Sequence, residues 1–228
     1  MKMEKWVISL GGSRIIPEDV DDIFLKEFKK LILTSKKSYK FIVVTGGGIT
    51  ARKYIEALQE MNKGIKKQSE MGIAITRFHA NFLMRIFGKP ANDELPFSIK
   101  RIKNLILKNK VVFCGALRDK KRQTTDATAA KIASSLNCSF INLTNVKGLY
   151  TDNPKTHLNV KFIKEITWKD FNNMTKKIKF KAGQHFVLDQ AGAKVILKKK
   201  VPTYITNSLK DIKNIINNKK FSGTLIRG

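Results

Sequence analysis

The chain has 228 residues, and its 45 lysines and arginines against 18 aspartates and glutamates give a formal charge of +27. Its hydrophobic content of 42% argues against intrinsic disorder. The sequence has no apolar run near the roughly 20 residues of a membrane span and no signal-like amino terminus, so we expect a cytoplasmic protein without a membrane partner. Cys114 and Cys138 lack metal-ligand spacing and are predicted to be reduced core thiols.

The positive charge has three interpretations. It could be a solvated surface, a polynucleotide-binding surface, or a field that steers small polyphosphates toward a site. The lysines are scattered from end to end, and the sequence has no zinc-finger spacing, no RRM-type aromatic motif and no continuous basic helix. We therefore expect no nucleic-acid partner, and the steering interpretation requires a phosphate site.

Short apolar runs alternate with longer amphipathic stretches along the chain. The runs predict strands at Trp6–Leu10, Phe41–Thr45, Val111–Cys114, Phe140–Leu143, Thr203–Thr206 and Thr224–Ile226. The amphipathic stretches predict helices at Val20–Leu33, Ala51–Met61, Gly72–Phe87, Ile99–Leu107, Asp126–Leu136 and Gln184–Lys199, and Asn92–Pro96 is predicted to be a loop. The alternation indicates an α/β fold with an open, mostly parallel sheet sandwiched between helices, in a single domain over residues 1–228.

Two glycine clusters follow the first two predicted strands. Gly11-Gly12-Ser13 comes directly after the first, and Gly46-Gly47-Gly48 comes after the second and opens a helix that carries Arg52 in its first turn. Ligands of open α/β sheets bind beyond the carboxyl ends of the strands, where glycines and a helix amino terminus favour an anion. Neither cluster matches a Rossmann or Walker pattern. The two clusters together predict a phosphate site of another kind.

The chain resembles the amino acid kinase superfamily and, within it, the archaeal-type UMP kinases. The resemblance runs nearly the whole length. The segments that carry it are Leu10–Ser13, Thr45–Tyr54, Gly72-Ile73 with Thr76-Arg77, Thr124–Ala127, Thr144–Thr151, Asn153–Lys155, Lys181–Gly183, Asp189 and Ala193-Lys194. It implies ATP-dependent conversion of UMP to UDP with Mg²⁺, in pyrimidine nucleotide biosynthesis, by a homohexamer.

The resemblance also implies roles for individual residues, with the acceptor side mainly in the first part of the chain and the ATP side mainly in the later part. Arg52, Gly12 and Gly48 would be the catalytic residues. ATP would contact Gly12, Ser13, Gly48, Arg52, Thr144, Asn145, Tyr150 and Asn153. UMP would contact Gly47, Ser69, Asp119, Lys120, Lys121, Arg122, Gln123, Thr124 and Thr125. No protein ligand to a metal is assigned.

This chemistry requires cations and backbone N–H groups rather than a base. The acceptor oxygen of a nucleoside monophosphate is already anionic, so transfer depends on holding two polyanions in line and neutralising their repulsion. The three histidines, His79, His157 and His185, are therefore interpreted as surface or packing residues.

The sequence departs from the family pattern mainly on the acceptor side. Ser9 stands where many superfamily members carry a lysine, and Ser69 stands where an aspartate would bind the acceptor ribose. Lys147 replaces an acid beside the donor and either supplies the missing cation or faces solvent. Residues 115–123 form a basic loop in place of one rich in Gly and Pro, and Asn153 replaces an aspartate.

These departures leave alternatives open. One is a related kinase that phosphorylates another acceptor, such as isopentenyl phosphate, acetylglutamate or carbamate. Thr45 stands before the glycines, where isopentenyl phosphate kinases carry a histidine. Another is a nucleotide-binding storage or regulatory subunit with little catalysis, as in molybdenum storage proteins.

Overall fold

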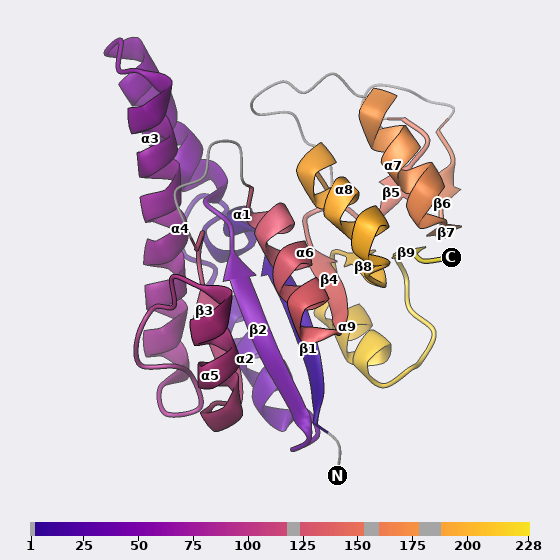
Figure 1. Cartoon of the computed structure of the whole chain (residues 1–228). Helices are drawn as coiled ribbons and strands as arrows, with labels where there is room; N and C mark the ends of the chain where they lie inside the picture. The colour runs from indigo at the N-terminus through magenta and orange to yellow at the C-terminus, as the bar shows by residue number, and fades with distance from the viewer. Residues whose placement is uncertain (1–2, 118–123, 153–159, 178–187) are drawn as a thin grey trace.

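The computed structural model describes residues 3–117, 124–152, 160–177 and 188–228. Its centre is a sheet of seven strands in the order β3-β2-β1-β4-β8-β9-β7 (Figure 1). The strands are β1 (Glu4–Leu10), β2 (Tyr39–Thr45), β3 (Val111–Cys114), β4 (Ser139–Leu143), β7 (Glu165–Ile166), β8 (Thr203–Thr206) and β9 (Thr224–Ile226). The first five in spatial order are parallel, whereas β9 runs antiparallel to β8 and β7 runs parallel to β9.

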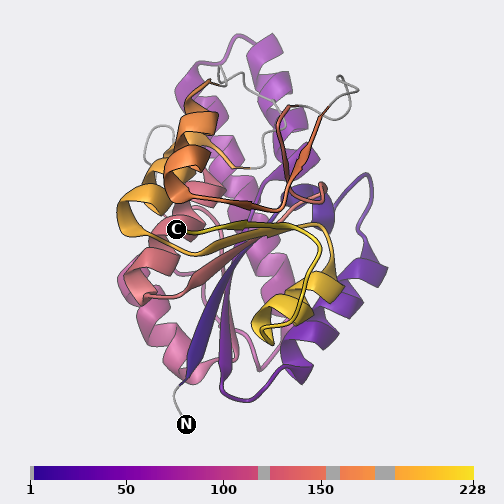
Figure 2. The ribbon, with the colours of Figure 1, turned by 90° about the vertical axis from the view of Figure 1, so that its right-hand side faces the viewer.

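Helices cover both faces of this sheet. One face carries α2 (Asp22–Thr34), α4 (Ile65–Phe87) and α9 (Leu209–Ile216), and the other carries α5 (Ile99–Lys108), α6 (Thr125–Leu136), α7 (Trp168–Lys177) and α8 (Gln190–Lys199). Figure 2 shows α2 and α9 side by side on the first face. The remaining elements are α1 (Gly12–Ile15), α3 (Gly48–Glu60) and the hairpin of β5 (Leu149–Tyr150) and β6 (Phe162–Ile163).

Strand β1 explains why the sheet needs two helical layers. Its side chains alternate between two hydrophobic cores, with Ile8 in one and Val7 in the other, and both are fully buried. A strand that is apolar on both faces is stable only when both faces are covered. The predicted α/β sandwich is thereby confirmed.

The predicted strands lie within two residues of the observed ones. Helix α3 begins three residues before its predicted start, and two other helix starts were wrong by more. Helix α4 begins at Ile65 rather than Gly72, since Gly72 is accommodated inside the helix, where a Cβ would press on Ile55 of α3 at 3.3 Å. Helix α8 begins at Gln190, because Asp189 caps it by accepting a 2.6 Å bond from the Gly192 N–H. Residues 184–187 of that prediction lie outside the described residues.

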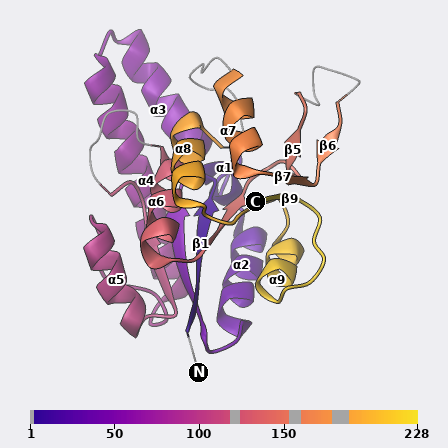
Figure 3. The same ribbon diagram turned by 45° about the vertical axis from the view of Figure 1, so that its right-hand side comes forward.

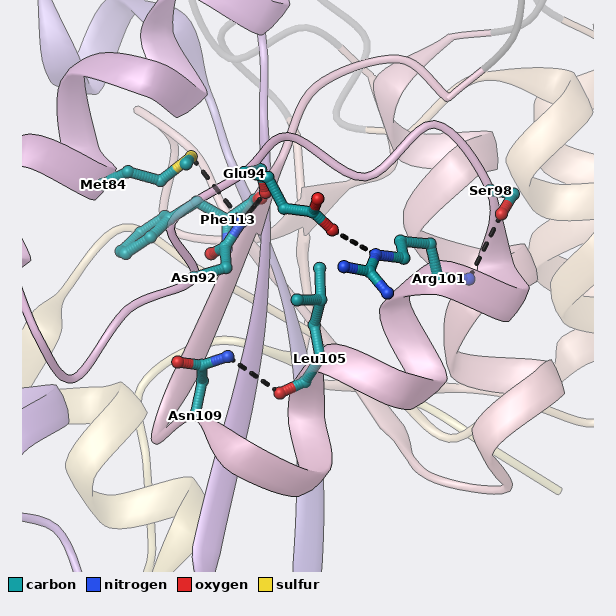
Figure 4. A network of polar contacts seen from close by, with 8 residues as sticks. All are labelled: Met84, Asn92, Glu94, Ser98, Arg101, Leu105, Asn109 and Phe113. Atoms are coloured by element: carbon teal, nitrogen blue, oxygen red, sulfur yellow. Dashed lines mark hydrogen bonds and ion pairs between the residues drawn. The ribbon is translucent and has the colours of Figure 1, made fainter.

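The segment around Asn92 is a loop, as predicted, but it is also tied into the core. The Asn92 side chain accepts a hydrogen bond from the Phe113 N–H at 2.7 Å and donates to the Phe113 carbonyl at 3.0 Å (Figure 4). It thus occupies both backbone groups of a residue in β3, the outer strand of the parallel part. The neighbouring Glu94 forms an ion pair with Arg101 of α5. This loop covers a sheet edge that would otherwise be open to pairing.

The two cysteines are free thiols, with Cys114 buried in β3 and Cys138 half-buried before β4. Burial raises the pKa of each thiol to about 12, so neither is a reactive thiolate near neutral pH. Among the helices in the described part of the chain, none is long and apolar enough to cross a membrane.

Candidate functional site

The two glycine clusters lie together at the carboxyl ends of β1 and β2. These strands are paired in parallel with Leu10 opposite Thr45, so the turns that follow them emerge side by side. The Gly46 N–H donates to the Leu10 carbonyl at 2.9 Å, and the Gly11 N–H donates to the Leu143 carbonyl of β4 at 3.3 Å. Backbone hydrogen bonds therefore hold the carboxyl ends of β1, β2 and β4 together at the same side of the sheet.

The two turns meet backbone to backbone. A Cβ placed on Gly12 would lie 2.4 Å from the Gly48 nitrogen and 2.6 Å from the Gly46 carbonyl oxygen. A Cβ on Gly48 would lie 2.5 Å from the Ser13 nitrogen, and Gly48 also has a positive φ of 61°. Both positions require glycine, the second because L side chains rarely adopt that backbone conformation. The sequence predicted the clusters, but only the structure shows that they contact each other.

Helix α3 begins in the second turn and directs its amino terminus toward this edge. Gly47 is its N-cap, and Arg52 lies just after its first turn, half-buried. The free N–H groups and positive dipole of a helix start favour an anion, and a guanidinium adds charge-assisted hydrogen bonds. Figures 1 and 3 show α3 and α4 extending beyond the carboxyl ends of the strands on one side. The β5–β6 hairpin lies on the other side (Figure 3).

The strand order reverses at β1, which is where such sheets bind ligands. The chain passes from β1 to β2 and β3 on one side and then returns to β4 on the other. Thr144 and Asn145 follow β4, and the Thr144 N–H donates to the Thr206 carbonyl at 3.0 Å. Tyr150 lies on β5 with its ring 5.3 Å from that of Phe162 in an edge-on arrangement. These residues thus surround the same edge of the sheet.

Two carboxylates accompany Ser9 beneath the turns. The Ser9 hydroxyl donates to Asp126 at 2.7 Å, and Asp126 lies in the first turn of α6. Burial raises the pKa of Asp126 to about 7, the Ser9 hydroxyl opposes that shift, and the nearby Asp189 adds to it by repulsion. Asp189 accepts the Gly192 N–H with one oxygen, while its other oxygen is buried without a hydrogen-bond partner. A pair of close, desolvated carboxylates of this kind favours a cation.

Helix α4 braces the strand ends from the acceptor side. The Thr45 hydroxyl donates to the Thr76 carbonyl at 2.7 Å, and the Thr76 hydroxyl accepts the Ala116 N–H at 3.0 Å. Arg77 donates to the Ala116 carbonyl at 3.0 Å and lies 4.8 Å from the centre of the Phe97 ring. The segment that leads into the basic loop is thereby anchored to α4. The basic loop residues 118–123 lie outside the described residues.

The other predicted site residues are distributed as follows. Thr124 caps α6 by accepting the Ala127 N–H at 3.2 Å, and Thr125 opens that helix. Ser69 is half-buried on α4, while the neighbouring Glu70 forms ion pairs with Lys66 and Lys67 on its own helix. Asp119, Lys120, Lys121, Arg122, Gln123 and Asn153 lie outside the described residues, as do His157 and His185.

Lys147 does not point its charge at the glycine turns. Its Nζ lies 5.0 Å from the centre of the Phe162 ring, and the residue is exposed. The carboxylates Asp126 and Asp189 were in the sequence motifs but had been given no role. Their signal was a carboxylate at each helix start, a pattern that capping alone also explains.

A hollow of about 960 Å³ lies elsewhere, between the end of α4 and helix α5. It borders Asn109 and Ala91, next to the amino end of β3, and thus the opposite end of that strand from the glycine turns. Its lining includes Arg85, Lys89, Arg101 and Lys108. The hollow is therefore separate from the site at the carboxyl ends of the strands.

The fold and the site together define an α/β protein whose two glycine turns meet at a topological switch point, the place where sheets of this kind bind ligands. A family model for the amino acid kinase family matches residues 4–207. The chain therefore belongs to the amino acid kinase family.

Relatives match almost end to end. The uridylate kinase of Thermococcus kodakarensis is 32% identical, covering 96% of this chain and 98% of its own. That of Methanococcus aeolicus is also 32% identical, covering 97% and 99%. The crystal structure of the Archaeoglobus fulgidus uridylate kinase superposes with a TM-score of 0.85 at 28% identity, covering 99% of this chain and 100% of that one.

Proposed function

We propose that this chain is a kinase that transfers the γ-phosphoryl group of ATP to UMP, giving ADP and UDP. The observation that carries the proposal is the contact between the Gly12 and Gly48 backbones at the start of α3. It creates one surface of N–H groups at which the phosphate of UMP can meet the phosphate chain of ATP. The near end-to-end similarity to uridylate kinases supports UMP as the acceptor.

The chain's own groups account for the transfer without a general base. The UMP phosphate oxygen is already an anion, so the barrier is dominated by bringing it in line with the γ-phosphorus against repulsion. Gly47 would receive the acceptor phosphate, Gly12 and Ser13 would lie along the ATP phosphates, and Gly48 and Arg52 would stabilise the charge on the group in transit. Thr144, Asn145, Tyr150 and Asn153 would hold the adenosine. The acceptor side thus belongs mainly to the first part of one domain.

Mg²⁺ fits the carboxylates beside the turns. Mg²⁺ is commonly held by one or two carboxylates together with substrate phosphates, and Asp126 with the unpartnered oxygen of Asp189 offers such a pair. These two residues would hold the ion, which when bound neutralises phosphate charge. Ser9 would orient Asp126 through its 2.7 Å hydrogen bond. These carboxylates would thus place a positive charge near the position where other family members carry the lysine that Ser9 replaces.

Ser69, Thr124, Thr125 and residues 119–123 would contact UMP. We further propose that the protein acts in the cytoplasm as a homohexamer, as the family resemblance implies. Sedimentation velocity measures the assembly: a single species near six times the 25.9 kDa chain mass is expected. A stable monomer would refute the hexamer.

The test of function is an acceptor panel. Purified protein is incubated with Mg-ATP and, separately, UMP, CMP, AMP, GMP, isopentenyl phosphate and acetylglutamate, and products are followed by ³¹P NMR. UDP formation from UMP with the highest kcat/KM is expected. Preferred transfer to another acceptor would refute the substrate assignment, and ATP binding without transfer to any acceptor would instead identify a nucleotide-binding subunit.

A further inference from the structure

His79 lies fully buried beneath the second glycine turn. It is on α4 with 0% of its surface exposed, and its Nδ1 is 2.7 Å from the Gly46 carbonyl oxygen. A carbonyl oxygen can only accept, so Nδ1 carries the hydrogen of the neutral ring. Burial lowers the pKa of His79, and the bond to Gly46 only partly opposes that shift. The ring is therefore a neutral Nδ1–H donor.

The His79 hydrogen bond fixes the peptide that joins Gly46 to Gly47 in the second glycine turn. The Gly46 N–H already donates to Leu10 at 2.9 Å, so His79 holds the other end of the same residue. In a trans peptide the C=O and the following N–H point in opposite directions, and the structure has no cis peptide bonds in its described residues. Because the Gly46 carbonyl points toward His79 on α4, the Gly47 N–H points away from α4.

Packing alone does not explain a histidine at this position. Its Nε2 is buried and has no hydrogen-bond partner. A buried polar atom without a partner costs free energy that an apolar side chain of similar size would avoid. Helix α4 is held against the same strand end by the Thr45–Thr76 bond, so the donor is rigidly placed. What a histidine adds over an apolar side chain at this position is therefore the hydrogen bond to the Gly46 carbonyl.

We propose that His79 is a positioning residue that fixes the Gly46–Gly47 peptide and so directs the Gly47 N–H at the acceptor phosphate. The inference rests on the proposed kinase function. His79 itself touches no substrate, because it is buried behind the turn.

Two variants separate positioning from packing. His79→Leu fills much of the space but has no donor, whereas His79→Asn keeps a donor, since its Nδ2 takes the place of Nδ1 in the ring. We expect kcat/KM for UMP to fall about 30-fold in His79→Leu and to stay within about threefold in His79→Asn. The KM for ATP should change less than about twofold in both. Leu83→Val, on the same face of α4 and equally buried, is the matched control for lost packing and should keep kcat/KM.

A result in which folded His79→Leu keeps full kcat/KM would overturn the proposal. So would an Asn variant as impaired as the Leu variant at equal stability. If His79→Leu does not fold, the wild type with ¹⁵N-labelled histidine decides: the resonances missing from His79→Asn must report a protonated Nδ1 and an unprotonated Nε2. The opposite tautomer would overturn the proposal.

A binding readout separates this inference from the kinase proposal. UMP is titrated into ¹⁵N-labelled protein without ATP, and the Gly47 amide is followed. We expect it to shift in the wild type and in His79→Asn, and to shift less than half as far in His79→Leu at matched saturation. Equal shifts in all three would overturn the role of His79 even where the kinase is active. A wild type that binds UMP with this pattern but transfers no phosphoryl group would overturn the proposed function alone.

Discussion

The glycine turns and the β5–β6 hairpin lie at the same edge of the sheet but are built from different parts of the chain. At the turns the main chains touch, and a single added Cβ would come within 2.4 Å of the opposite backbone. At the hairpin the main chains of β5 and β6 pair with each other, and the side chains of Tyr150 and Lys147 pack on the Phe162 ring. At the turns the arrangement thus leaves no room for a side chain between the main chains, whereas at the hairpin the side chains form the contact surface. Substitutions at the glycine turns should therefore lower the rate of phosphoryl transfer, whereas substitutions at the hairpin should weaken the affinity for the nucleotide.

The largest effect is expected from Gly12→Ala, which inserts a methyl group between the turns. We expect a loss of at least about 100-fold in kcat/KM, since a shift of about 1 Å at the reacting centre has that cost. The free energy of unfolding should fall by about 1–3 kcal/mol from overpacking. Steady-state kinetics and urea denaturation measure the two.

Gly11→Ala is the matched control, because its Cβ would meet only the Leu143 carbonyl at 3.6 Å, an ordinary contact. It should keep kcat/KM within about twofold, as substitutions away from special features usually do. Equal activity of the two variants would show that the turns do not require backbone contact.

Asp126→Asn should have the next largest effect, because it removes a charge from the proposed Mg²⁺ site but keeps the shape. A loss of about 30-fold in kcat is expected, within the range for groups that support a metal, with an increased Mg²⁺ requirement. The readout is initial rate against Mg²⁺ concentration at saturating ATP and UMP. Asp170→Asn, exposed at the start of α7, serves as the control, and a Mg²⁺ dependence unchanged in Asp126→Asn would remove that residue from the site.

His79 predicts a pH effect on stability. Its folded pKa lies below the ordinary value of 6.5, so well above pH 6.5 the ring is neutral in both states and its full contribution to stability is present. As pH falls below 6.5, the unfolded chain binds a proton that the folded chain does not bind, and stability is lost. Urea denaturation at pH 7.5 and 5.5 should therefore show the wild type losing more stability than His79→Asn. Parallel losses would mean that the ring titrates normally in the folded protein.

The smallest effect is expected at Lys147. Its ammonium group interacts with the exposed side of Phe162, a contact worth about 0.5–1 kcal/mol. Lys147→Met should therefore leave kcat within about twofold and raise the KM for ATP by no more than about threefold. A tenfold fall in kcat would instead mean that Lys147 supplies the cation missing at Ser9, one of the two roles that the sequence left open.

The sheet was predictable because its strands are short, apolar on both faces and separated by helices. The short elements that sequence reasoning missed are held by tertiary contacts rather than by pattern. Strands β5, β6 and β7 have two residues each; β5 pairs with β6, and β7 pairs with β9, about 60 positions away along the chain. Helix α1 has four residues and follows directly from the first glycine turn. Helices α7 and α9 were also absent from the prediction, although the buried Ile212, Ile215 and Ile216 of α9 have the spacing of an amphipathic helix.

The site was predictable as a set of glycines, though not as an arrangement. Spacing along the chain placed Gly12 and Gly48 after neighbouring strands, but their mutual contact depends on strand register. Asp126 and Asp189 lie 63 positions apart and meet only because α6 and α8 pack together. His79 was interpreted as a surface or packing residue; it is buried, but its bond to a glycine carbonyl on another element has no sequence signal.

The most direct test of the account is the stereochemical course of the transfer. ATP made chiral at the γ-phosphorus with oxygen isotopes is used to phosphorylate UMP, and the configuration of the β-phosphorus of UDP is determined. In the proposed mechanism the two turns bring donor and acceptor together for a single in-line displacement, so inversion is predicted. Retention would indicate two successive transfers through a phosphorylated protein group and would contradict the account.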